Sequence, residues 1–251
     1  MIQKLSARER ETLDLIMSDE SVTVASLSKS LAVSPVTVRT TLNSLAEKGV
    51  IVRTWGGAAP AFHPDIIERQ KQCTAEKTRI ARAAAELIQD GDTVMIEAGT
   101  TTAEIARFLL GRRDVKIVSN SALVVPYARA NPGIVLTQIG GEFRPETESF
   151  VGPSALEQLR RFHVRLAFVG TDGFSAQAGL TTHLVEGAEI VKSMAALADT
   201  TVVVADSSKY AKHGFVNVLQ LNEVDILISD DGIEATKRAE ITDLGVDLRL
   251  V

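Results

Sequence analysis

Apolar residues recur at helical spacing three times within the first fifty positions of the chain, which predicts three short helices. Ser6 and Glu9 have the spacing of a capping box at the start of the first helix. The third helix begins at Ser34 and Pro35, a capping serine followed by a proline whose missing N–H costs nothing in the first turn, and Gly49 ends it. The second and third helices, joined by a tight turn, predict a helix-turn-helix.

From residue 76 onward the pattern changes, and short apolar, β-favouring runs alternate with helical patterns. A first run at residues 93–97 leads into a glycine and threonine turn at residues 98–102, and then into a helix over residues 103–110. Further runs predict strands at residues 115–119, 134–139, 165–169, 201–205 and 225–229. Such alternation is typical of an α/β domain whose mostly parallel sheet is flanked by helices.

The segment between these two patterns contains two prolines, Pro60 and Pro64, that interrupt regular structure and mark a boundary. Just before it, residues 50–58 have the pattern of a strand pair with a turn at a glycine pair, which predicts a wing. We therefore predict a winged helix-turn-helix domain at residues 1–58, a linker with a helical lead-in at residues 59–75, and a larger α/β domain at residues 76–251.

Charge and cysteine content limit the classes of function. The 251-residue chain has a formal net charge of -5, so nucleic-acid binding requires a local patch. Residues 1–58 contain seven Lys or Arg and six Asp or Glu, net +1, which leaves 20 and 26, net -6, for the rest. The single Cys73 excludes an internal disulfide and indicates a reducing compartment. Since no apolar run has membrane-spanning or signal-peptide character, we expect a cytoplasmic protein without membrane contact.

The third helix and the wing carry the candidate DNA-binding residues. Small hydroxyl residues, one arginine and one asparagine on the outward side of the helix suit a major groove, and the wing adds an arginine for phosphate. The predicted DNA-binding residues are Ser34, Pro35, Thr37, Arg39, Thr40, Asn43 and Arg53. We expect Trp55 in the wing to pack rather than to stack on bases. The alternative is a small helical domain that docks on protein, with its charges forming only a solvated face.

Each predicted strand of the α/β domain ends in glycine or a small polar residue, and ligands of parallel sheets bind outside these ends. Gly99 permits backbone angles closed to other residues, and the amides of the following helix can hold a phosphate or a carboxylate. Arg144 and Lys209 can balance an anion, while other polar side chains can hold sugar hydroxyls. The predicted effector-binding residues are Gly99, Thr100, Thr101, Thr102, Asn120, Gly141, Arg144, Asp172, Asp206 and Lys209. Alternatively, the threonines only cap a helix and residues 206–209 form only a turn.

The motifs in both predicted domains resemble those of one family. Val33-Ser34-Pro35-Val36-Thr37-Val38-Arg39 and Arg53-Thr54-Trp55-Gly56-Gly57-Ala58 resemble the DeoR family of bacterial sugar-metabolism regulators. The strand ends at residues 99–102, 119–121, 140–144, 170–173 and 206–209 resemble the effector domain of that family, so the likeness covers nearly the whole chain. The resemblance implies a domain similar in fold to ribose-phosphate isomerase and a phosphorylated sugar or sugar derivative as effector.

Two departures from the family pattern concern the DNA-reading segment. The family usually places a second arginine and then an aspartate where this chain has Thr40 and Thr41, and a histidine is common where Trp55 stands. These positions bear on which operator sequence is bound, whereas the mode of binding that the resemblance implies is unchanged.

A further departure lies in the segment that resembles the ligand-binding helix of the effector domain. The family implies an effector-binding role for Glu189 and commonly carries a lysine two residues later, where this chain has Val191. Lys192 lies one position on, and this displacement turns a side chain by about 100° on a helix. Whether Lys192 or the neighbouring His183 reaches a ligand is left open. The four histidines have no metal-ligand spacing, and we expect neither a metal nor a cofactor.

These features predict a transcriptional regulator, most simply a repressor of a sugar-utilisation operon, whose larger domain binds a phosphorylated sugar that modulates operator binding. We expect a homo-oligomer, a dimer or a tetramer, because paired heads read two half-sites. The alternative is a sugar-phosphate isomerase or deaminase with an accessory DNA-binding head, in which Glu97, Asp172 or Glu189 acts as general base beside Lys209. We favour the regulator over the enzyme, and over a third alternative in which the chain is a protein-binding scaffold.

Overall fold

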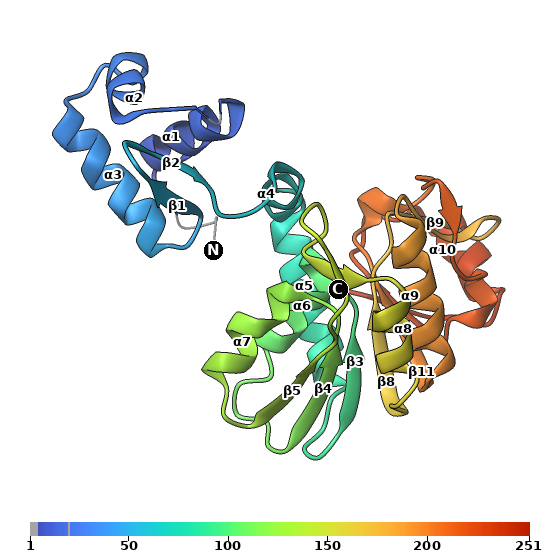
Figure 1. Ribbon diagram of the computed structural model, residues 1–251. Helices are drawn as coiled ribbons and strands as arrows, with labels where there is room; N and C mark the ends of the chain where they lie inside the picture. The colour runs from blue at the N-terminus through green and yellow to red at the C-terminus, as the bar shows by residue number, and fades with distance from the viewer. Residues whose placement is uncertain (1–4, 20) are drawn as a thin grey trace. The chain divides into compact units, whose positions relative to one another are not determined.

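The computed structural model describes residues 5–19 and 21–251 (Figure 1). The chain divides into two compact units, Met1–Gln72 and Cys73–Val251. Each unit has its own cluster of buried apolar side chains. Among the described residues, no helix combines the length and the apolar character needed to cross a bilayer.

The first unit is a winged helix-turn-helix. It consists of α1 (Ala7–Ser18), α2 (Val24–Ser30), α3 (Pro35–Glu47), β1 (Ile51–Thr54), β2 (Gly57–Pro60) and α4 (Pro64–Lys71). The two strands pair antiparallel directly after α3, so the predicted wing is confirmed. The apolar face of each helix meets one core, whose most buried members include Leu13, Ile16, Leu27, Val38, Leu42, Leu45 and Ile67.

Local capping signals set where these helices start. The Ser6 hydroxyl accepts a hydrogen bond from the Glu9 amide, and the Glu9 carboxylate accepts one from the Ser6 amide, which completes the predicted capping box. Ser34 caps α3 by accepting from the Thr37 amide at 3.2 Å, with Pro35 in the first helical position. Helix α3 therefore begins at the predicted residue.

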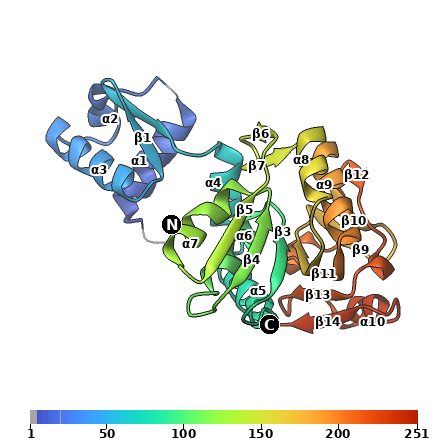
Figure 2. The same ribbon diagram turned by 60° about the horizontal axis from the view of Figure 1, so that its bottom comes forward.

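The second unit is built on a seven-stranded sheet with the order β14-β13-β11-β8-β3-β4-β5, and every pair of neighbours is parallel (Figures 1 and 2). The strands are β3 (Thr93–Ile96), β4 (Val115–Ser119), β5 (Ile134–Gln138), β8 (Val164–Val169), β11 (Ala198–Val204), β13 (Ile226–Ser229) and β14 (Asp247–Leu250). The predicted α/β domain with a parallel sheet is confirmed.

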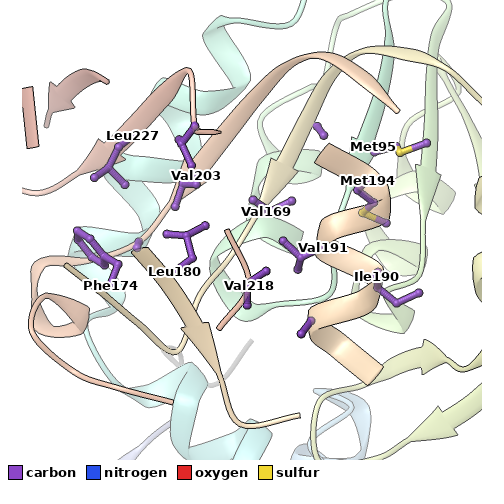
Figure 3. Close-up of a cluster of buried hydrophobic side chains, with 14 of the residues drawn as sticks. Met95, Val169, Phe174, Leu180, Ile190, Val191, Met194, Val203, Val218 and Leu227 are labelled. Carbon is purple, nitrogen blue, oxygen red and sulfur yellow. The ribbon is translucent and has the colours of Figure 1, made fainter. Parts of the chain in front are cut away.

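Helices flank this sheet and bury both of its faces. They are α5 (Thr74–Glu86), α6 (Thr100–Arg107), α7 (Val125–Ala130), α8 (Pro153–Leu159), α9 (Val185–Ala196) and α10 (Ala235–Thr242). Figure 3 shows Met194 and Val191 of α9 beside Val169 of β8, within one apolar cluster that also includes Val203 of β11. Parallel strands covered on both faces need continuous apolar runs, and Val202, Val203 and Val204 are all nearly inaccessible.

Two small antiparallel sheets lie outside the main one, and the sequence analysis missed both. They are β6 (Glu142–Arg144) with β7 (Ser149–Val151), and β9 (Gly173–Ser175) with β10 (Gly179–Thr182) and β12 (Val216–Asn217). It also missed β14, an edge strand in which exposed and half-buried residues alternate, so that its apolar content is low.

The helix after β3 starts earlier than predicted. The sequence analysis placed Thr100, Thr101 and Thr102 in a turn before a helix at residue 103, whereas α6 begins at Thr100 with Gly99 as its N-cap. The Thr102 hydroxyl donates to the Gly99 carbonyl at 3.1 Å, a bond available only inside the first turn. The threonines are therefore part of the helix and not of the loop that leads into it.

Candidate functional site

The outward side of α3 presents the residues predicted to read DNA. Ser34, Pro35, Arg39, Thr40 and Asn43 are exposed, and Thr37 is half-buried against the cap. The sequence analysis did not include the neighbouring Val36, which is 69% exposed and could meet a thymine methyl group in a major groove. The sequence could have revealed this exposure, because Val36 is an apolar residue that lies outside the inward-facing positions of the helix.

Internal hydrogen bonds limit what the hydroxyl groups of α3 can read. Thr40 donates its hydroxyl proton to the Val36 carbonyl and Thr41 donates to the Thr37 carbonyl, each at 3.1 Å. A hydroxyl group engaged in this way can offer only its lone pairs outward. Thr40 is therefore suited to accept a hydrogen bond from a base amino group, and the donor function on this surface lies with Arg39.

A hydrogen bond between two predicted DNA-binding residues, Arg53 and Asn43, links the wing to α3. Arg53 donates from Nη1 to Oδ1 of Asn43 at 2.7 Å and from Nε to the Gly57 carbonyl at 3.3 Å. Both side chains are exposed, so the bond links them on the surface of the unit. Asn43 thus holds Arg53 in addition to being available to DNA.

Trp55 contradicts its expected role. The sequence analysis expected it to pack, but its side chain is fully exposed at a relative accessibility of 105%. Thr54 pairs with Gly57 across the hairpin, so Trp55 and Gly56 form a two-residue turn that points the indole away from the core. Periodicity could not reveal this exposure, because a turn residue belongs to neither face of a strand.

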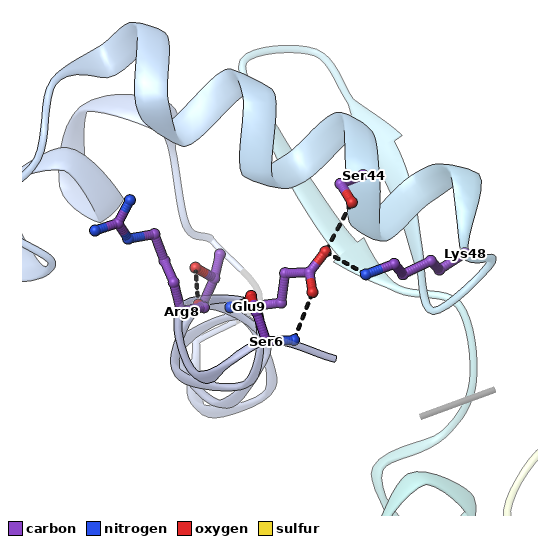
Figure 4. A network of polar contacts seen from close by, with 6 residues as sticks. Ser6, Arg8, Glu9, Ser44 and Lys48 are labelled. Carbon is purple, nitrogen blue, oxygen red and sulfur yellow. Dashed lines mark hydrogen bonds and ion pairs between the residues drawn. The ribbon is translucent and has the colours of Figure 1, made fainter. Parts of the chain in front are cut away.

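A buried carboxylate fixes the angle between α1 and α3. Figure 4 shows Glu9 accepting hydrogen bonds from Lys48 Nζ at 2.6 Å, from the Ser44 hydroxyl at 2.7 Å and from the Ser6 amide at 2.7 Å. The bond from Lys48, followed by those from Ser44 and Ser6, lowers the pKa of Glu9 to about 2. The end of α3 is therefore held to α1 by a charge that stays ionised at neutral pH.

In the second unit, the corner between β3 and α6 is the predicted anion site. Gly99 is extended, with φ -176°, so the expected need for unusual backbone angles is wrong. The position instead requires little bulk, since a Cβ atom there would lie 2.8 Å from the Thr102 hydroxyl oxygen. No side chain caps α6, which leaves the amides of its first turn as the donors that an anion would use.

Asn120, predicted to bind effector, is used to join three chain segments. Its Oδ1 accepts from the Ala98 amide at 3.0 Å and its Nδ2 donates to the Phe150 carbonyl at 3.2 Å. Only 1% of the residue is accessible. At the same edge of the sheet, the Gly170 amide donates to Glu97 Oε2 at 3.1 Å. The ends of β3, β4 and β8 are thus cross-linked by side chains.

A cluster of charges surrounds the end of β11. Asp206 is 2% accessible and its carboxylate accepts from the Ser208 amide at 3.2 Å. Lys77 of α5 is 7% accessible and lies within the field of Asp206, Lys209 and Glu104. Burial lowers the pKa of Lys77, and Asp206 opposes that change. The cluster therefore brings two lysines together, on α5 and after β11, near Glu104 of α6.

The sequence analysis missed Lys77. The signal was present, because residues 77, 80, 81 and 84 fall on one face of α5, and the other three are apolar and completely buried. A lysine at an inward position of an amphipathic helix is costly to bury unless it meets an anion or a polar partner.

The remaining predicted effector residues lie in separate contacts. Arg144 donates to Glu186 at 2.7 Å and to Glu142 at 3.3 Å. The bond to Glu186 raises the pKa of Arg144, and the same bond lowers the pKa of Glu186. Asp172 accepts from the Thr182 hydroxyl at 2.9 Å. Arg144 is thus offset by two carboxylates rather than open to an anion.

The last two predicted effector residues, Gly141 and Glu189, lie in different surroundings. Gly141 has φ +151°, and a Cβ there would lie 2.5 Å from the Val151 carbonyl oxygen, so only glycine fits. Glu189 is exposed on α9 and pairs with Lys192 at 3.5 Å. Val191, at the position where the family commonly has lysine, is buried in the apolar core. No group of histidine, cysteine or acidic residues in the described part of the chain could hold a metal ion.

Comparison with known proteins gives matches over both units. A model of the DeoR-like helix-turn-helix domain matches residues 8–61, and one of the DeoR C-terminal sensor domain matches residues 72–231. The chain is 33% identical to the HTH-type transcriptional regulator GlpR of Haloferax volcanii, covering 95% of each protein. It is also 33% identical to the HTH-type transcriptional repressor GlcR of Bacillus subtilis, covering 87% of this chain and 85% of that protein.

More distant matches extend this set. The glycerol-3-phosphate regulon repressor of Escherichia coli is 27% identical over 98% of this chain and 99% of that protein. Among solved structures, ribose 5-phosphate isomerase A from Methanocaldococcus jannaschii is 22% identical over 54% of each chain, with a TM-score of 0.39. At this TM-score the likeness supports no conclusion about activity.

Proposed function

We propose that this chain, which belongs to the DeoR family of transcriptional regulators, represses a sugar-utilisation operon and is controlled by a phosphorylated sugar. Its family consists of DNA-binding regulators, so the isomerase and deaminase alternatives are set aside. The observation that carries the sensing half of the proposal is the burial of Lys77 on α5, where the charges of Asp206 and Lys209 act on it, close to the buried Asp206.

The arrangement around β11 supports an anionic ligand with hydroxyl groups. Two lysines provide positive charge, and the uncapped first turn of α6 provides amide donors. Asp206 and Asp172 provide carboxylate oxygens that can accept from sugar hydroxyls. A phosphorylated sugar combines both kinds of group, and the name of the glycerol-3-phosphate regulon repressor points to the same chemical class.

We assign DNA reading to Ser34, Pro35, Thr37, Arg39, Thr40, Asn43 and Arg53, with Val36 added. The assignment is supported by the exposure of Arg53 on β1 of the wing and of every assigned residue of α3 and its N-cap except the half-buried Thr37. The regulator is proposed to act as a dimer or tetramer, because a single head reads few bases and two heads can span half-sites one or more helical turns apart. Effector binding has to favour one arrangement of the heads through differential affinity.

The first experiment identifies both ligands of the full-length protein. Duplexes that it retains are selected from a random-sequence library, and their binding is measured by mobility shift. Phosphorylated sugars, amino sugars and polyols are then screened by thermal shift, since a ligand well above its Kd raises the melting temperature. We expect a phosphorylated compound that both stabilises the protein and changes its affinity for the selected duplex. Stabilisation only by unphosphorylated sugars would contradict the proposed effector class.

A further inference from the structure

Among the described residues of the winged unit, the most exposed large apolar side chain is that of Trp55, the only tryptophan in the sequence. Trp55 is fully accessible, whereas the large apolar surface of an indole ring is normally buried in a folded domain. Within the same hairpin Val52 is 56% exposed, and Arg53 and Thr54 are also exposed. The apex of the wing therefore presents an aromatic ring with polar and apolar neighbours.

The turn that carries Trp55 is fixed to the rest of its unit. The Gly56 carbonyl accepts from the Val24 amide at 2.9 Å, and Gly57 forms a bridge with Thr23. A Cβ atom at Gly57 would lie 2.1 Å from the Val22 carbonyl oxygen, so the hairpin packs directly on the backbone before α2. On its other side, Arg53 is bonded to Asn43 of α3. The indole thus has a defined place relative to the reading helix.

The charge around the apex indicates the chemistry of its partner. From Lys48 to Pro64 the sequence contains one lysine, one arginine and one histidine, and no aspartate or glutamate. A segment that contains no carboxylate side chain and places Arg53 two residues from an exposed aromatic ring is complementary to a polyanion. A double-stranded nucleic acid adds the apolar faces of its sugars to a line of phosphates, which matches a ring beside a guanidinium.

We propose that Trp55 is a DNA contact, in which the indole packs on the deoxyribose rings of the operator next to the groove that α3 enters. The indole N–H is then available to donate to a phosphate oxygen. Because sugars and phosphates are the same in every sequence, this contact adds affinity without selecting bases. The inference rests on the proposed DNA-reading surface and extends it to the tip of the wing.

The single tryptophan allows a direct test on the full-length, unmodified protein. Acrylamide quenching of its fluorescence is measured alone, with a duplex selected by the protein, and with a random-sequence duplex at low salt. We expect strong quenching in the free protein and a severalfold smaller quenching constant in both complexes. Unchanged quenching in a complex that migrates as bound in the mobility shift would overturn the inference. Weak quenching in the free protein would also overturn it, because the indole would then be covered without DNA.

Variants separate this contact from a purely electrostatic one. Trp55→Ser is expected to weaken binding to both duplexes about five- to tenfold while the slope of log affinity against log salt is unchanged. Arg53→Ala should reduce that slope by about 1. Phe215→Ser, at an aromatic residue 82% exposed in the other unit, is the matched control and should bind like the parent. Equal affinity of Trp55→Ser and the parent would reject the contact, whereas a parent that retains no duplex would refute the proposed function itself.

Discussion

The reading surface of the first unit and the strand ends of the second differ in how their polar side chains are engaged. On α3, Arg39 is exposed, and the bonds that hold the helix to α1 are made by Glu9 with Lys48 and Ser44. At the strand ends, Asn120 and Asp206 are almost inaccessible and bonded within the protein. The α3 surface exposes its arginine to a partner, whereas the polar side chains at the strand ends are hydrogen-bonded within the protein.

This difference suits the two tasks. A groove-reading helix needs a rigid frame with unoccupied outward groups, because any reordering on binding reduces affinity. A sensor must change when its ligand arrives, and a ligand that replaces an internal partner produces such a change. The pair of Arg144 and Glu186 illustrates the second case, since a phosphate that attracts Arg144 competes with a carboxylate of the protein.

The largest expected effect breaks the sensing side alone. Lys209→Ala should weaken binding of the phosphorylated effector about ten- to hundredfold, because a charged donor to phosphate is lost, and should leave affinity for operator DNA unchanged. Calorimetry with the effector found in the screen measures the affinity for effector, and mobility shift measures the affinity for operator DNA. Lys116→Ala, which removes an exposed lysine of β4 outside the candidate site, is the matched control. Normal affinity in Lys209→Ala would remove this residue from the site.

The next effect breaks the reading side alone. Arg39→Ala should lose about 1–3 kcal/mol of operator binding and reduce discrimination at one base position, since an arginine can pair bidentately with guanine. Competition between the selected duplex and single-base variants of it measures both. Arg160→Ala, exposed in the second unit, should behave like the parent. An unaltered ranking of the base variants would mean that Arg39 contacts only phosphate.

The sequence predicted the structure of α3 better than the structure around the strand ends of the second unit, for a physical reason. Ser34, Pro35 and Gly49 act on residues within four positions of themselves, so the start and end of α3 can be inferred from neighbours in the chain. The surroundings of Arg144 depend on Glu186, 42 residues away, and those of Lys77 depend on Asp206, which follows β11. Residue type could place Arg144 near the site, but only the fold reveals the carboxylate that already holds it.

A smaller effect concerns the frame that supports α3. Glu9→Gln should lower the stability of the first unit by about 1–2 kcal/mol at neutral pH, because the charge that binds Lys48 and Ser44 is lost. Hydrogen exchange of peptides from α1 and α3, followed by mass spectrometry, isolates this unit from the other. Exchange in the sheet of the second unit serves as the internal control and should not change.

The pH dependence of that frame has a definite sign. The pKa of Glu9 falls from 4.5 to about 2 on folding, so its stabilisation is complete above pH 4.5 and is lost as the pH falls toward 2. The parent should therefore lose protection in α1 and α3 through this window, and Glu9→Gln should lose less. Parallel pH profiles of the two proteins would show that Lys48 and Ser44 do not stabilise the charged form.

The smallest expected effect on operator binding concerns the hydrogen bond that links α3 to the wing. Asn43→Ala should weaken operator binding about two- to fivefold, because Arg53 loses the acceptor that orients it toward phosphate. If Asn43 acts through Arg53, the double variant Asn43→Ala, Arg53→Ala should bind like Arg53→Ala alone, so that the two losses are not additive. Additive losses would instead identify Asn43 as an independent reader of bases. Because the reading surface is already formed without DNA, this coupling should also appear as faster exchange of the β1 amides in the free Asn43→Ala protein.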